Sequence, residues 1–64
     1  MSERELEVLR MMARGETNEE IGAHLGITLR TVKAHMTSIM AKLGATNRTQ
    51  AVSIAVRKGY IHLE

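Results

Sequence analysis

The chain has 64 residues, a net charge of +2, no cysteine and 44% hydrophobic residues. Its length allows one small domain, here residues 1–64, and the lack of cysteine excludes disulfides and Cys-based zinc sites, which suits a reducing, cytoplasmic setting. No apolar run approaches the roughly 18 residues of a membrane span, and the first residues have no signal-peptide character, so no membrane partner is expected. The only aromatic residue is Tyr60, which argues against stacking on single-stranded bases.

The charges are divided unevenly along the chain. Residues 1–26 carry three cations and six acids, whereas residues 27–64 carry six cations and one acid, Glu64. No acid lies between Ile21 and Leu63. This segregation favours a polyanionic partner on one side of the domain, although on charge alone an ordinary solvated face is an equal alternative.

Capping residues and glycines divide the chain into four predicted helices. Each apolar-periodic stretch follows a Ser, Thr or Asn that can cap a helix, in three cases with Glu or Gln three residues later as in a capping box. Each stretch also precedes a glycine that can end a helix. The starts are Ser2, Thr17, Thr28 and Asn47, and the ends are Gly15, Gly26, Gly44 and Gly59. The predicted helices lie near 3–14, 18–25, 29–43 and 48–58, which makes the fold class all-α.

Apolar residues at three- and four-residue spacings indicate one buried face on each helix. The five methionines are interpreted as fillers of this core rather than as ligands. The predicted core residues are Leu6, Leu9, Met12, Ala13, Ile21, Leu25, Val32, Met36, Ile39, Leu43, Ala51, Val52, Ile54 and Ala55.

The second and third predicted helices read as a helix-turn-helix motif near residues 17–36. The turn Leu25–Thr28 has the length and the glycine that this motif requires. With the apolar stripe of the third helix facing inward, 100° per residue places Arg30, Lys33, Ala34, Thr37 and Ala41 outward. Cations, a hydroxyl and small side chains without an acid are suited to the major groove of DNA, so Arg30, Lys33, Ala34 and Thr37 are the candidate base contacts.

Candidate phosphate contacts surround this face. Thr17 and Asn18 lie at the N-terminus of the second helix, where free N–H groups and the helix dipole attract an anion. Alternatives stay open for three others, since His35 fits a half-buried core residue slightly better, and Lys42 and Arg48 could be plain solvated cations. The full set is Thr17, Asn18, Thr28, Thr31, His35, Lys42 and Arg48.

Six segments of the chain together resemble the LuxR/NarL-type helix-turn-helix domain. They occur in the order and spacing of that family and cover nearly the whole chain. The segments are Ser2–Leu9 (SERELEVL), Gly15–Ile21 (GETNEEI), Leu25–Thr28 (LGIT), Thr31–His35 (TVKAH), Lys42–Arg48 (KLGATNR) and Gln50–Val52 (QAV).

The resemblance implies a four-helix DNA-binding domain, normally the C-terminal output half of a bacterial transcription regulator such as a two-component response regulator. In the family the positions of Lys33, Ala34 and Thr37, and often that of Arg30, face base edges in double-stranded DNA. The fourth helix makes a two-fold dimer contact there, for which Val52, Ser53 and Val56 are the candidates. RNA polymerase is a further candidate partner.

Two departures from the family limit what carries over. Ala34 and Thr37 are short where some members have longer polar or charged residues, so base specificity does not transfer. Gly22 stands where Ala is usual in the second helix and is expected to cost the helix about 1 kcal/mol relative to Ala.

Three other classes of protein fit the sequence less well. A region-4-like module of a sigma factor has a similar motif, but the Lys42–Arg48 segment and a full fourth helix favour the LuxR type. A small helical adaptor, binding protein through its fourth helix, would leave the acid-free 21–63 segment unexplained. An enzyme is disfavoured because the chain has no Asp, no Cys and no P-loop, and His24, His35 and His62 lack metal-site spacing. No catalytic residue, metal or cofactor is therefore expected.

Overall fold

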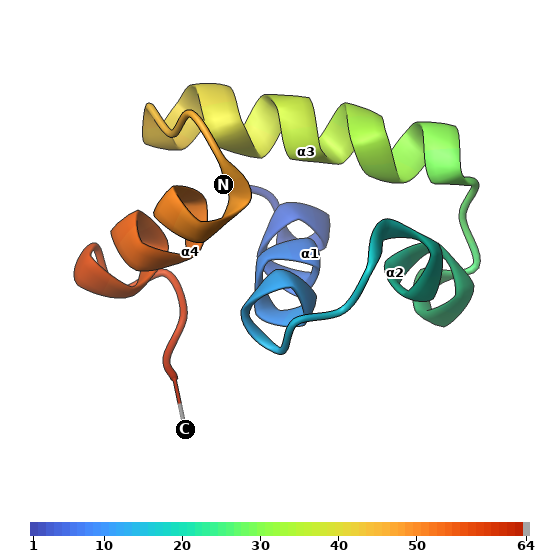
Figure 1. The fold of residues 1–64 in the computed structure, drawn as a ribbon, viewed down its shortest axis with the longest axis horizontal. Helices are drawn as coiled ribbons and strands as arrows, with labels where there is room; N and C mark the ends of the chain where they lie inside the picture. Colours follow the sequence, from blue (N-terminus) through green and yellow to red (C-terminus); the bar gives the residue numbers. More distant parts are fainter. Residues whose placement is uncertain (64) are drawn as a thin grey trace.

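A computed structural model describes residues 1–63, which contain four α-helices and no strand. The helices are α1 (Glu3–Ala13), α2 (Asn18–Leu25), α3 (Leu29–Leu43) and α4 (Arg48–Arg57). The long α3 extends along one side of the molecule, with α1 beneath its middle and α2 and α4 on either side of α1 (Figure 1). Among the described residues, no helix combines the length and apolar character that crossing a bilayer requires.

The predicted caps account for where the helices begin. Ser2 and Thr17 each form a complete capping box, with Glu5 and Glu20 respectively. The third predicted capping box is only half formed. The Asn47 side chain accepts a hydrogen bond from the Gln50 N–H at 2.8 Å, but the Gln50 side chain accepts from Thr46 instead of from the Asn47 backbone. Helices α1 and α4 each end one residue earlier than predicted.

A single core lies where the helices meet. Eight of the predicted core residues are buried, and the other six are partly buried and pack against them. The prediction missed Val8, which neighbours Leu9 on the inner face of α1, and Ile61, which follows α4 and so falls outside any helical period. Four of the five methionines contact this core, whereas Met1 is exposed. The buried residues are Val8, Leu9, Met12, Ile21, Val32, Ile39, Leu43, Ala51, Ala55 and Ile61.

Helix α3 packs against each of the other three helices. The inward stripe of α3, formed by Val32, Ile39 and Leu43, is buried. The orientation of α3 is therefore determined by the whole core and not by the short α2 alone. The opposite side of α3 is exposed.

Candidate nucleic-acid interface

The outward side of α3 holds the residues that the helical period placed there. Arg30, Lys33, Ala34 and Thr37 are all exposed, and Ala41 continues the same face. The Thr37 hydroxyl donates a hydrogen bond to the backbone carbonyl of Lys33, with 3.1 Å between oxygens. The four candidate base contacts therefore lie together on one open helical surface that contains no acid.

The turn before α3 is shaped by a glycine and by the threonine cap of the helix. Gly26 has a positive φ of 68°, a conformation that favours glycine. Thr28 caps α3 by accepting from the Thr31 N–H at 3.1 Å, and the two hydroxyls share a further hydrogen bond of 3.0 Å. These contacts fix the orientation of both threonine side chains at the start of the helix.

Gly22 has a different role from the one its helix propensity suggests. It is buried in α2, and a Cβ added there would lie 2.9 Å from the carbonyl oxygen of Ile27. The prediction considered only the entropy of a helical glycine. In the folded chain this glycine also allows the turn to approach α2 closely.

Arg48 joins the N-termini of α2 and α4. Its guanidinium donates to Asn18 Oδ1 at 3.1 Å and to the Glu16 backbone carbonyl. Arg48 is half-buried, so it is not a plain solvated cation. Because both acceptors are neutral, its positive charge is not cancelled by this pairing and lies close to two helix N-termini, each of which favours an anion.

Lys42 is held by a buried carboxylate that the sequence interpretation treated only as part of a cap. The Lys42 Nζ lies 2.8 and 3.1 Å from the two carboxylate oxygens of Glu5, and the Ser38 hydroxyl donates to the same group at 2.7 Å. The side chain of Glu5 is 6% exposed and that of Lys42 50% exposed. The hydrogen bonds from Lys42, from the Ser2 backbone and from Ser38, in that order, lower the pKa of Glu5 to about 2.

A signal for this burial was present in the sequence. Glu5 lies three and four residues before Val8 and Leu9, which places it on the inner face of α1. His35 is partly buried at the edge of the α3 stripe. This position suits both a half-buried core residue and a phosphate contact.

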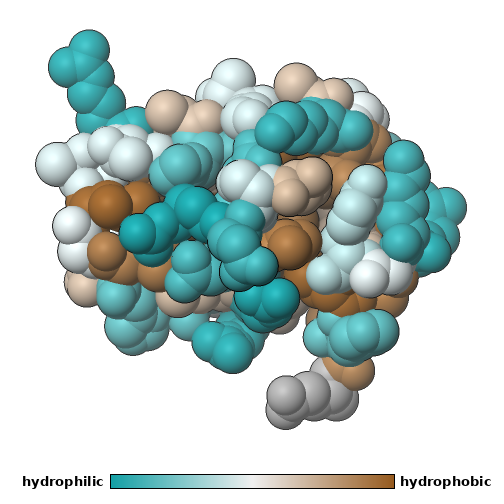
Figure 2. Space-filling model, turned by 180° about the vertical axis from the view of Figure 1, so that it is seen from behind, coloured by the Kyte–Doolittle hydropathy of each residue, from teal (hydrophilic) through white to brown (hydrophobic). Residues whose placement is uncertain are grey.

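The candidate dimer contacts lie on α4 beside an open groove. Val52 and Val56 are half-buried and Ser53 is exposed, while Ala51 and Ala55 on the other side of the helix are buried. The groove has a volume of about 530 Å³, and residues of α1 and the C-terminal tail complete its walls. Figure 2 shows the molecule from behind, with apolar surface in separate patches between hydrophilic side chains.

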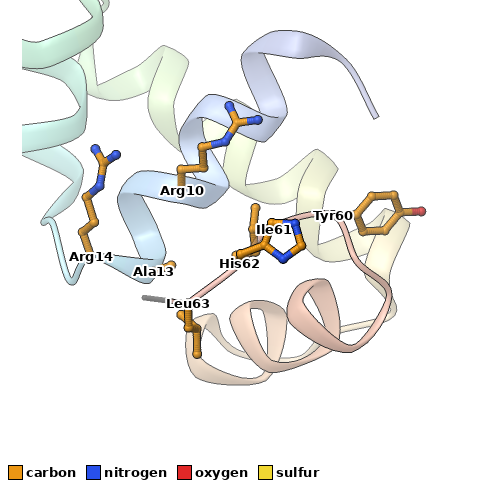
Figure 3. A pocket seen from close by; sticks show the side chains of 7 residues that line it. All are labelled: Arg10, Ala13, Arg14, Tyr60, Ile61, His62 and Leu63. Carbon is orange, nitrogen blue, oxygen red and sulfur yellow. The ribbon is translucent and has the colours of Figure 1, made fainter.

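A second pocket, of about 540 Å³, lies between α1 and the C-terminal tail and includes no residue of α3. Figure 3 shows the Arg10 and Arg14 side chains extending away from the tail, with the Tyr60 ring on the other side. The polar groups therefore do not converge on one point, as a ligand site would require.

The histidines form no metal site in the described part of the chain. Residues 1–63 contain no group of three or more His, Cys, Asp or Glu able to hold an ion. His24 has a carboxylate partner, since its Nδ1 lies 2.6 Å from Glu16 Oε1. Its side chain is 60% exposed at the end of α2 rather than enclosed in a catalytic cavity.

Comparisons with known proteins identify similar chains. Residues 1–55 match the family model described as bacterial regulatory proteins, luxR family. The transcriptional activator protein PhzR of Pseudomonas fluorescens is 55% identical over 60 residues, covering 94% of this chain and 25% of that protein. The transcriptional regulatory protein LiaR of Bacillus subtilis is 47% identical over 62 residues, covering 97% of this chain and 29% of LiaR.

Solved structures of similar fold also include bacterial regulators. The response regulator ChrA of a heme-sensing two-component system superposes with a TM-score of 0.92 at 40% identity, over 94% of this chain and 30% of ChrA. Vibrio cholerae VqmA gives 0.89 at 28% identity, over 94% of this chain and 27% of VqmA. The chain thus spans 25% to 30% of the length of these four proteins.

Proposed function

Since the chain belongs to the LuxR family of bacterial regulatory proteins, a family of transcription regulators rather than a class of enzymes, we propose that it binds double-stranded DNA sequence-specifically through α3. The observation that carries this proposal is the exposed, acid-free face of Arg30, Lys33, Ala34 and Thr37. A B-DNA major groove, about 12 Å wide, admits an α-helix, and cations and small side chains are what its base edges and walls accept. In this proposal residues 1–64 form one DNA-binding domain.

The phosphate contacts of the proposal surround α3. Thr28 and Thr31 lie at its start and Lys42 near its end, with His35 between them, while Thr17, Asn18 and Arg48 lie where the N-termini of α2 and α4 meet. The hydrogen bonds of Arg48 and Lys42 hold both cations in place before DNA arrives, which lowers the entropy lost when they meet phosphates. Lys42 makes two hydrogen bonds to Glu5, and an ammonium has three N–H groups, so one remains for a phosphate.

We further propose that two copies meet through Val52, Ser53 and Val56 of α4 on a two-fold site. The half-buried valines beside an open groove support this surface, and VqmA is described as a dimer with a target DNA. The patch is small compared with the roughly 1,000 Å² that a stable interface buries, so the free domain should be monomeric.

The regulatory context is also a proposal. ChrA is named as a response regulator of a two-component system, and the chain covers 30% of its length. We therefore assign the chain to the output part of a cytoplasmic two-component response regulator, with RNA polymerase as a further partner. The match of residues 1–55 to the luxR family favours this over a sigma-factor module.

Fluorescence anisotropy with a random-sequence duplex across a salt series tests the proposal. We expect binding at low salt that weakens as salt rises, because phosphate contacts release counterions. Lys33→Ala should weaken binding to a preferred sequence, whereas Lys58→Ala, which removes an exposed lysine just after α4, is the matched control. Failure to bind any duplex at low salt, or equal losses for both variants, would contradict it.

A further inference from the structure

The exposed face of α3 offers only part of the chemistry that reads base edges. Asn and Gln recognise adenine, and Asp and Glu accept from cytosine, but none of these occurs at the four candidate base contacts. Arg30 and Lys33 are the side chains that pair with guanine, and Ala34 and Thr37 both carry a methyl group. The functions left to this face are guanine recognition and apolar contact.

The hydrogen bond of Thr37 decides which part of its side chain is available. A hydroxyl has one proton, and that of Thr37 is donated to the Lys33 carbonyl at 3.1 Å. The methyl group and the oxygen lone pairs remain for a partner. Ala34 lies three residues earlier on the same helix, about 4.5 Å along the axis, so the two methyl-bearing side chains are neighbours on one face.

We propose that Ala34 and Thr37 read the C5-methyl groups of thymines in the major groove, and that Thr37 does so with its methyl group rather than its hydroxyl. The target sequence then carries thymines next to guanines that pair with Arg30 and Lys33. This inference rests on the proposed function, since it names which bases the same face selects.

Two variants of Thr37 separate its methyl group from its hydroxyl. Thr37→Val keeps a methyl at the same place and removes the hydroxyl, whereas Thr37→Ser keeps the hydroxyl and removes the methyl. Thr37 is exposed, so neither change should unfold the domain. On a duplex selected from a random pool, Thr37→Val should bind within about twofold of wild type and Thr37→Ser about fourfold more weakly, the value of burying one such carbon. A loss with Val and none with Ser would overturn the proposal.

The matching experiment removes the methyl group from the DNA. Each thymine of the selected duplex is replaced in turn by uracil, which lacks only the C5-methyl. The affinity of wild type should fall about fourfold when the thymine at one or two of the positions is replaced. At the position that Thr37 contacts, replacing thymine by uracil should not weaken the binding of the Thr37→Ser variant any further. Cytosine at that position should bind poorly, and 5-methylcytosine should recover part of the affinity.

The outcomes distinguish this inference from the function on which it rests. If no duplex binds at low salt, the proposed function fails and the inference fails with it. If a selected duplex binds tightly but every uracil substitution leaves its affinity unchanged, DNA binding stands and methyl recognition is wrong.

Discussion

At Gly22, an added Cβ would lie 2.9 Å from the Ile27 carbonyl oxygen, closer than real Cβ atoms approach other atoms. Two effects therefore oppose each other in Gly22→Ala. Helix propensity favours Ala by about 1 kcal/mol, whereas forcing a methyl group against a backbone carbonyl costs about 1–3 kcal/mol. The second effect is at least as large as the first.

We therefore expect Gly22→Ala to give no net increase in the free energy of unfolding, measured by urea denaturation. Ser53→Ala, at an exposed position of α4, is the control and should be slightly stabilising through propensity alone. A gain of the full 1 kcal/mol in Gly22→Ala would mean that the turn moves aside without cost.

Lys33 and Arg48 are predicted to contact different parts of the DNA. Lys33→Ala should cost about 1–3 kcal/mol on the preferred site and relax the preference at one base position. Arg48→Ala should weaken binding to all sequences alike and flatten the salt slope by about one unit. Titrations of both variants on specific and random duplexes measure this. Identical behaviour of the two would show that the contacts are misassigned.

Glu5 connects α1 to the second half of α3 through hydrogen bonds with Ser38 and Lys42. A pKa lowered from 4.5 to about 2 means that the folded state favours the carboxylate. The stabilisation is therefore present above pH 4.5 and is lost as pH falls through 4.5 towards 2. Between pH 4.5 and pH 2 we expect the free energy of unfolding to fall by about 2 kcal/mol more in wild type than in Glu5→Gln. This value allows for the partial exposure of Lys42.

Glu20→Gln is the matched control for this pH series. Glu20 occupies the same position in the second capping box, and its pKa is also lowered, chiefly by the hydrogen bond from the Thr17 backbone. It is exposed and has no contact comparable to Lys42 among residues 1–63, so its removal should change the pH dependence less. Equal effects of the two variants in thermal melts would contradict a special role for Glu5.

The helices could be predicted from local signals in the sequence, whereas the hydrogen bonds that connect one helix to another could not. Ser2 and Thr17 cap helices through residues three positions away, so the chain order alone predicts them. The exposed face of α3 followed from the helical period in the same way. Arg48 and Asn18 are 30 residues apart, and Lys42 is 37 residues from Glu5, so their pairing depends on how α2 and α1 pack. The burial of Ile61 likewise depends on the path of the tail.

Assembly of two copies on DNA should depend on α4. Val56→Glu places a charge on the proposed dimer patch, so it should leave half-site binding nearly intact and abolish cooperative binding to two half-sites about one helical turn apart. Titrations of one-site and two-site duplexes measure this.

Ser53→Glu makes the same test at an exposed position where unfolding is not a concern, and His62→Glu, outside the patch, is the control. Cooperative binding by both α4 variants would show that this patch does not mediate assembly on DNA. A tight dimer without DNA in sedimentation would contradict the expected free monomer.

The burial of α3 against all three other helices also determines the thermodynamics of recognition. Its inner stripe is already in a dry core, so in the proposed complex the helix would not have to fold on entering the groove. Proteins whose DNA-binding segments order only on binding show a large negative heat-capacity change and a large unfavourable entropy. Here the heat capacity of binding should reflect only the surface removed from water at the interface, and calorimetry at several temperatures would give a correspondingly small slope of enthalpy against temperature.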